Sequence, residues 1–159
     1  MGKLKSVKQR FIENEYNIQR AIDTSIKAYE KYKSRIKKRV ENMLDQPYTY
    51  FYTYTLSDDY IKHDQQYHIK KIKATLPQAT FYLINNDYGD QTDRLHYHAL
   101  ASFNHKYDTT LLQKYQLGFT SIKEIKEPNA KAIYEYILKL SNHATKKSVA
   151  KIWRSRSKK

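Results

Sequence analysis

The chain of 159 residues contains no cysteine and only three glycines. Without cysteine it can form neither disulfides nor a cysteine-ligated zinc site. The glycines stand at Gly2, Gly89 and Gly118, too far apart to build a glycine-rich phosphate loop. The sequence therefore excludes a P-loop ATPase or helicase.

A hydrophobic run long enough to cross a membrane is also missing, and the first residues lack the apolar core of a secretory signal. We therefore expect an intracellular protein that works in the cytoplasm of its host cell without a membrane partner.

The chain is strongly basic. Thirty Lys and Arg residues against sixteen Asp and Glu residues leave a formal net charge of +14. This excess predicts binding to a polyanion, and nucleic acid is the commonest polyanion for a basic domain. The chain also holds 16 tyrosines. Most should lie in the core or on strand surfaces, but aromatics interleaved with cations also suit stacking on single-stranded bases.

The first 45 residues form a basic amphipathic extension. Neither proline nor glycine occurs from Val7 to Leu44, and apolar residues recur at about a 3.6-residue period. This pattern predicts one long helix, or two with a break. Its opposite face is basic, and we expect either nucleic-acid contacts there or a solvated face on a packing helix. The cations expected to contact nucleic acid are Lys31, Arg35, Lys38 and Arg39.

Residues 46–146 read as a single domain, followed by a basic tail at 147–159. The expected strands are 48–56, 80–84, 95–103 and 119–125, and the expected helices are 64–76, 109–115 and 129–143. Residues 85–93 read as a polar turn. This order predicts an α+β fold, a ferredoxin-like split β-α-β antiparallel sheet with its first and third strands side by side.

The most informative segment is Arg94-Leu95-His96-Tyr97-His98-Ala99-Leu100. Its alternation of polar and apolar residues is typical of a strand, so His96 and His98 should project from one face. Two imidazoles placed in this way can share one divalent metal ion. A His-x-His pair alone would equally describe two strand histidines that face solvent.

A second segment, Tyr134-Glu135-Tyr136-Ile137-Leu138-Lys139, reads as a helix that places a phenol and an ammonium about one turn apart. Tyr134 and Tyr136 would lie about 200° apart on this helix, so only one of them can face a metal. A tyrosine beside a metal that polarises a phosphodiester could attack and nick a nucleic acid strand.

Three blocks together resemble the HUH endonuclease superfamily, and within it the rolling-circle replication initiators of small bacteriophages and plasmids. The first block is the aromatic and threonine-rich segment Tyr50–Asp58. The second is Asp87-Tyr88-Gly89 followed by residues 94–100, and the third is Tyr136-Ile137-Leu138-Lys139. The resemblance covers residues 48–146 and implies the HUH nuclease fold.

The resemblance implies a metal-dependent endonuclease that nicks single-stranded DNA at an origin and can rejoin strands. Tyr136 would be the single nucleophile, because only Tyr136 has a lysine three residues later, and it would form a covalent 5′-phosphotyrosine and a free 3′-hydroxyl. Lys139 would stabilise the developing charge. Leu140 stands where many phage relatives have a second tyrosine.

The ligands of the implied metal, Mn²⁺ or Mg²⁺, would be His96, His98 and Asp87. The family more often has glutamate at the position of Asp87, and Asp90 and Asp93 are the alternatives. Further residues could contact the nucleic acid backbone. These are Thr53, Thr55 and Arg94.

The expected partners are a single-stranded origin and a host or separately encoded helicase and polymerase, in the setting of a virus or mobile element. The sequence leaves open whether the protein forms a homo-oligomer. One alternative is another HUH enzyme, a small transposase or a relaxase, although relaxases usually carry the tyrosine ahead of the histidines. The other is a non-catalytic module resembling an RNA-recognition domain, with Tyr52 and Tyr54 as exposed stacking platforms.

Overall fold

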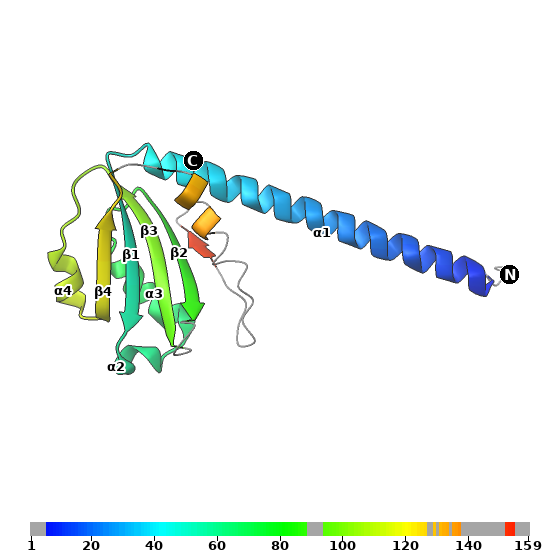
Figure 1. The fold of residues 1–159 in the computed structure, drawn as a ribbon. Helices are drawn as coiled ribbons and strands as arrows, with labels where there is room; N and C mark the ends of the chain where they lie inside the picture. Colours follow the sequence, from blue (N-terminus) through cyan, green and yellow to red (C-terminus); the bar gives the residue numbers. More distant parts are fainter. Residues whose placement is uncertain are drawn as a thin grey trace. The chain divides into compact units, whose positions relative to one another are not determined.

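The computed structural model describes residues 6–88, 94–126, 129, 131–133, 135–137 and 152–154. Its first element is a single unbroken helix, α1 (Val7–Leu44), which settles the choice between one helix and two (Figure 1). The helix begins with a reciprocal capping box: the Gln9 amide donates to the Ser6 hydroxyl, and the Ser6 amide donates to the Gln9 side chain. Pro47 follows closely after its end.

The chain divides into two compact units, Met1–Ile36 and Lys37–Lys159. The first unit is the greater part of α1. The second contains the last turns of α1 together with the sheet and the remaining helices. The boundary thus falls inside the helix. Among the described residues, no helix is both long and apolar enough to cross a membrane.

The second unit is an α+β fold built on an antiparallel sheet of order β4-β1-β3-β2-β5 (Figure 1). The strands are β1 (Tyr48–Leu56), β2 (Phe81–Tyr88), β3 (Leu95–Phe103), β4 (Gly118–Glu124) and β5 (Ile152–Arg154). The helices between them are α2 (Asp58–Ile61), α3 (Gln65–Ala74) and α4 (Thr110–Tyr115). The prediction that the first and third strands are neighbours is confirmed.

The structure differs from the sequence prediction at three places. The sequence predicted a turn at residues 85–88. In the structure, strand β2 continues through them, because their backbone pairs with β3. The one-turn helix α2 and the short edge strand β5 were not predicted. Of the predicted last helix at 129–143, residues 131–133 and 135–137 are helical, and the other residues except Asn129 lie outside the described part.

One face of the sheet forms the main hydrophobic core. Even-numbered residues of β1 and odd-numbered residues of β3 point to this face and pack with α3 and α4. Much of this core is aromatic: Tyr52 and Tyr54 are 0% and 1% exposed. The Tyr54 hydroxyl satisfies its hydrogen-bonding need with the Thr75 hydroxyl at 2.8 Å. The expectation that most tyrosines serve the core holds for this strand.

The other face carries the last turns of α1. The Thr49 hydroxyl donates to the Met43 carbonyl at 2.8 Å, and the Arg39 guanidinium lies over the Phe81 ring. Val40 and Met43 are fully buried. Arg39 therefore corrects one prediction: it is only 9% exposed and does not belong to an open basic face of the helix.

Candidate metal centre and its neighbouring tyrosine

Two adjacent strands, β2 and β3, bring the candidate ligands together on this second face of the sheet, and β1 places Thr53 beside them. The antiparallel register sets His98 of β3 opposite Thr53 of β1 and Asn85 of β2, and sets His96 opposite Asp87. Directly paired residues project to the same face of a sheet. Asp87, His96 and Thr53 therefore all surround His98.

The two imidazoles face a single carboxylate. Nε2 of His96 lies 3.5 Å from Oδ2 of Asp87, and Nε2 of His98 lies 3.6 Å from the same oxygen. The candidate ligand atoms of the three residues all lie within 4.8 Å of one another. Two imidazole nitrogens and one carboxylate oxygen are a donor set that divalent transition metals accept. The three residues that the sequence predicted as ligands thus form a group that could hold a metal ion.

The other ring nitrogens of both histidines have their own partners. Nδ1 of His96 lies 3.1 Å from the Arg94 carbonyl oxygen and donates to it, so in the neutral ring Nε2 is the acceptor. Nδ1 of His98 lies 3.1 Å from the Thr53 hydroxyl. Such outer contacts orient metal-binding imidazoles and fix their tautomers. The sequence did not predict this role for Thr53.

His98 is the more enclosed of the two histidines. Its side chain is 8% exposed, against 21% for His96. Burial, followed by the neighbouring His96 imidazole, lowers the pKa of His98 to about 4, although the Asp87 carboxylate opposes this shift. His98 is therefore neutral at physiological pH, which is the protonation state that a metal ligand needs.

Tyr136 lies against this group. Its ring centroid is 5.9 Å from that of His98 and 5.7 Å from that of Phe51, and it is 41% exposed. Partial burial, and after it the Asp87 carboxylate, raise the pKa of the Tyr136 phenol. Tyr134 and Lys139, the competing tyrosine and the lysine of the same motif, lie outside the described residues, as do Asp90 and Asp93.

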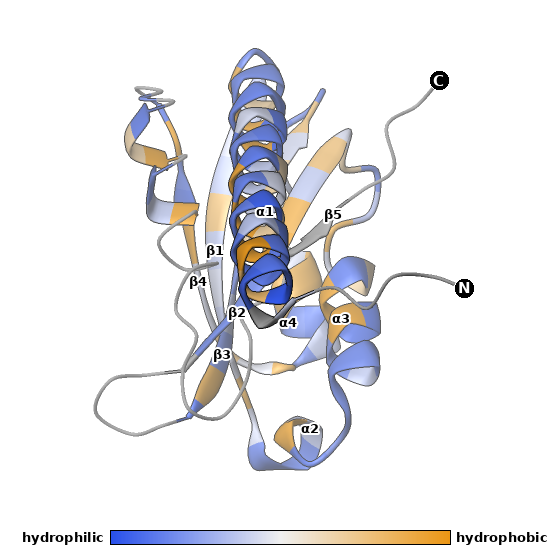
Figure 2. Ribbon diagram, turned by 90° about the vertical axis from the view of Figure 1, so that its right-hand side faces the viewer, coloured by the Kyte–Doolittle hydropathy of each residue, from blue (hydrophilic) through white to orange (hydrophobic). Residues whose placement is uncertain are grey.

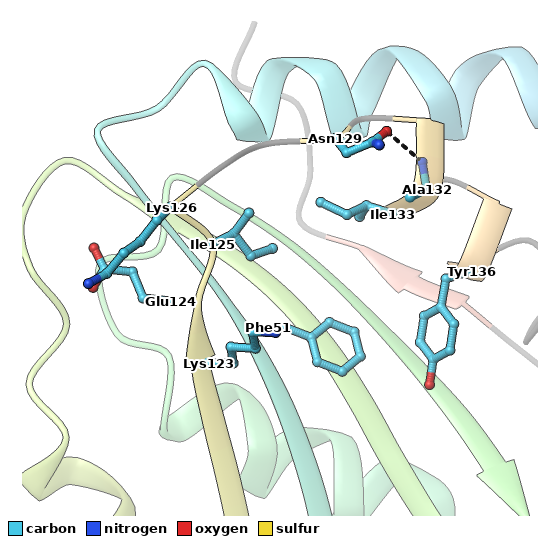
Figure 3. Close-up of a pocket in the computed structure, with 9 residues that line it drawn as sticks. All are labelled: Phe51, Lys123, Glu124, Ile125, Lys126, Asn129, Ala132, Ile133 and Tyr136. Atoms are coloured by element: carbon cyan, nitrogen blue, oxygen red, sulfur yellow. Dashed lines mark hydrogen bonds between the residues drawn. The ribbon is translucent and has the colours of Figure 1, made fainter.

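Beside Tyr136 the surface opens into a groove of about 620 Å³ (Figure 3). Two aromatic side chains line this groove: Phe51 extends from strand β1, and Tyr136 extends from the helical residues 135–137. The Asn129 side chain accepts a hydrogen bond from the Ala132 amide and thereby caps the start of that segment. The Phe51 ring also stacks on His98 at 5.5 Å, so one wall of the groove contacts a candidate metal ligand.

The residues expected to contact nucleic acid differ in how exposed they are and in the partners that they have. Arg94 donates to the Leu56 carbonyl at 2.6 Å and to Asp58 at 3.1 Å, and thereby connects the start of β3 to α2. Thr55 lies two residues from Thr53 on the same strand and is half-buried. Three of the four cations predicted on α1 are exposed. These are Lys31, Arg35 and Lys38.

Comparison with known proteins adds little to this site. No protein-family model matches the chain, and no curated protein matches it. Among solved structures, the chain is similar to the crystal structure of the hypothetical protein ORF119 from Sulfolobus islandicus rod-shaped virus 1. The similarity has a TM-score of 0.49 and 22% sequence identity, and it covers 70% of this chain and 97% of that chain.

Proposed function

We propose that this protein is a metal-dependent endonuclease of the HUH type, a rolling-circle replication initiator that nicks single-stranded DNA through Tyr136. One observation carries the proposal: the Tyr136 ring packs on His98, whose Nε2 faces Asp87 together with that of His96. A tyrosine and a group that could hold a metal ion therefore lie in contact.

Asp87, His96 and His98 would hold the divalent cation, Mn²⁺ or Mg²⁺. Bound to these residues, the cation would supply Lewis-acid polarisation of the scissile phosphate. The mixed set of two nitrogens and one oxygen suits Mn²⁺ well, and Mg²⁺ prefers oxygen ligands. Thr53 and the Arg94 carbonyl would keep both imidazoles directed at that position.

Tyr136 would carry the covalent step. Its phenolic oxygen forms a bond to phosphorus while the bond from phosphorus to the 3′-oxygen breaks. The phenol releases its proton to solvent, and the departing 3′-oxygen takes up a proton to become a free hydroxyl. The product is a 5′-phosphotyrosine, whose reversal rejoins strands without ATP. Lys139 would stabilise the negative charge that develops in this step.

Partial burial and the Asp87 carboxylate raise the pKa of Tyr136. They therefore favour the protonated phenol, which is a weaker nucleophile than the phenolate. Neutralising Asp87 with a bound cation would remove the second of these causes. The same cluster would thus serve both the phosphate and the nucleophile.

The geometry favours this proposal over a binding module that stacks bases on the sheet. That alternative needs Tyr52 and Tyr54 on an open face, but both side chains are buried against the helices. A transposase or relaxase would use the same chemistry on another substrate. The net charge of +14 supports a nucleic acid substrate in each case.

The test is a covalent-adduct assay. Single-stranded fragments of the parent genome, labelled at their 3′ ends, are incubated with the protein and Mn²⁺ and then separated under denaturing conditions. Label that stays with the protein supports a 5′-phosphotyrosine. Complete absence of adduct and of nicked strands across all fragments would reject the proposal.

A further inference from the structure

The first unit of the chain exposes an unusual amount of apolar surface. Helix α1 carries seven large hydrophobic residues that are 39% to 66% exposed, in a helix whose colours in Figure 2 alternate between hydrophilic and hydrophobic. They are Phe11, Ile12, Tyr16, Ile18, Ile22, Ile26 and Tyr29. Such a concentration marks an interaction surface, because helices gain most of their stability from packing of an amphipathic face.

Five of these residues form one stripe. At 100° per residue, the positions fall within about 80° of arc around the helix axis. They are Phe11, Ile18, Ile22, Ile26 and Tyr29, which we call the N-terminal stripe. The same face continues into Val40 and Met43, which are fully buried within the second unit. The helix thus has one apolar face that is covered near its end and open along its first two-thirds.

We propose that the N-terminal stripe pairs with the stripe of a second copy of this chain, in an antiparallel two-helix arrangement. The spacing of four of the five stripe residues is self-complementary: Phe11 and Tyr29 each lie nine residues from Arg20, and Ile18 and Ile22 each lie two residues from it. The fifth residue, Ile26, falls opposite Asn14 of the other copy. A two-fold axis at Arg20 therefore sets Phe11 against Tyr29 of the other copy and Ile18 against Ile22, as an isologous contact requires.

The charge distribution favours a second copy as the occupant. Between Val7 and Ser25 the helix carries three cations and three anions, so this segment does not repel its own copy. Between Ile26 and Arg39 it carries seven cations and one anion. An antiparallel pair moves these basic segments to opposite ends, whereas a parallel pair would place them side by side. The neutral segment also lacks the excess of cations that draws a helix to an anionic membrane.

The available area is sufficient. Five half-exposed side chains of this size offer on the order of 500 Å² per chain, given roughly 150–250 Å² for a large apolar residue. Two copies would bury about 1,000 Å² from these side chains alone, which is near the lower limit for a specific interface. The basic face, which includes Lys31 and Lys38, lies on the other side of the helix and would stay open.

The oligomeric state of the full chain tests this inference. In sedimentation equilibrium we expect a dimer that dissociates on dilution, and we expect Ile22→Glu to make the chain monomeric. Thr24→Glu is the matched control, since it adds the same charge two residues away on the opposite face and should leave the dimer intact. A chain that is monomeric at every concentration, or that binds anionic vesicles only as a monomer, would overturn the proposal.

Cross-linking tests the orientation without relying on a destabilised variant. The chain has no cysteine, so introduced cysteines have no competitor. A mixture of Phe11→Cys and Tyr29→Cys proteins should form a disulfide between the two variants under mild oxidation. Phe11→Cys alone should not, because the antiparallel pair holds these positions about 27 Å apart along the axis. Efficient cross-linking of Phe11→Cys alone would indicate a parallel pair and overturn the arrangement.

Discussion

The hydroxyl of Thr53 lies 3.1 Å from Nδ1 of His98, on the strand that neighbours the histidine strand. This hydrogen bond links strand β1 to the His98 ring, whose Nε2 faces the Asp87 carboxylate. The metal centre that we propose therefore depends on the pairing of β1 with β3 as well as on its three ligands.

The first prediction concerns this outer contact. Thr53→Val keeps the shape of the side chain but removes the hydroxyl, so His98 loses its orienting partner. We expect Mn²⁺ affinity to fall about 10- to 100-fold, the usual effect of deleting such a contact. Calorimetric titration measures it. Thr55→Val, two residues along the same face, is the control and should bind Mn²⁺ as the wild type does.

The second prediction concerns acid stability and a histidine away from the candidate metal ligands. His68 is 2% exposed, with Nε2 at 2.7 Å from the Tyr60 carbonyl and Nδ1 at 2.9 Å from the Tyr97 hydroxyl. Burial lowers the pKa of His68 below its ordinary value. The unfolded chain therefore takes up a proton first, and the free energy of unfolding should decrease as pH falls below about 6.5.

Urea unfolding in EDTA across this pH range checks the second prediction. His68→Gln should be less stable at neutral pH, yet its stability should depend less steeply on pH, since one of the two buried histidines with a lowered pKa is gone while His98 remains. An equally steep dependence in the variant would show that other groups control acid unfolding.

The third prediction concerns the exposed cations of α1. Replacing Lys31, Arg35 and Lys38 together by glutamine should weaken binding to single-stranded DNA. If all three contact phosphates, the slope of log affinity against log salt should become shallower by about 2. Point changes are preferable to a truncation at residue 44, because Val40 and Met43 are buried in the unit that contains the sheet.

Binding titrations at several salt concentrations measure the change in this slope. A control triple variant replaces exposed lysines elsewhere in the chain, at positions Lys70, Lys106 and Lys114. An equal loss of slope in this control would mean that overall charge, and not the helix, governs affinity.

The fourth prediction concerns the proposed ligands. His96→Ala and His98→Ala should each abolish measurable Mn²⁺ binding and adduct formation, because water replaces an imidazole poorly in a site with only two of them. EDTA should reproduce the loss of activity. His105→Ala changes an exposed histidine outside the cluster and should have no effect. Full activity in EDTA would show that the cluster does not act through a metal.

Much of the fold could be predicted because its signals are local. The alternation in β1 and β3 gave both strands with their observed ends, and the helical period over Val7–Leu44 predicted helix without tertiary information but left open one helix or two. Strand β2 was cut short because Asn85, Asn86 and Asp87 are typical turn residues. Only their backbone pairing with β3 keeps them extended, and that pairing is not visible locally.

The grouping of the candidate residues was predictable to a similar degree. A two-residue period places His96 and His98 on one face from the sequence alone, and the resemblance to HUH enzymes added Asp87 and Tyr136. The role of Thr53 could not be predicted, because it follows from the register between β1 and β3. For the same reason the sequence could not show that Tyr52 and Tyr54 face the helices while Phe51 and Thr53 face the candidate ligand His98.

The central claim is that Tyr136 attacks a phosphodiester beside the cluster of His96, His98 and Asp87. The most direct measurement is the amount of covalent protein–DNA adduct formed with Mn²⁺ by the wild type, Tyr136→Phe and Tyr134→Phe. We expect adduct from the wild type and from Tyr134→Phe. Tyr136→Phe should form none, with folding and DNA binding nearly unchanged, because only the nucleophilic oxygen is lost. Adduct from Tyr136→Phe at the wild-type level would contradict the account.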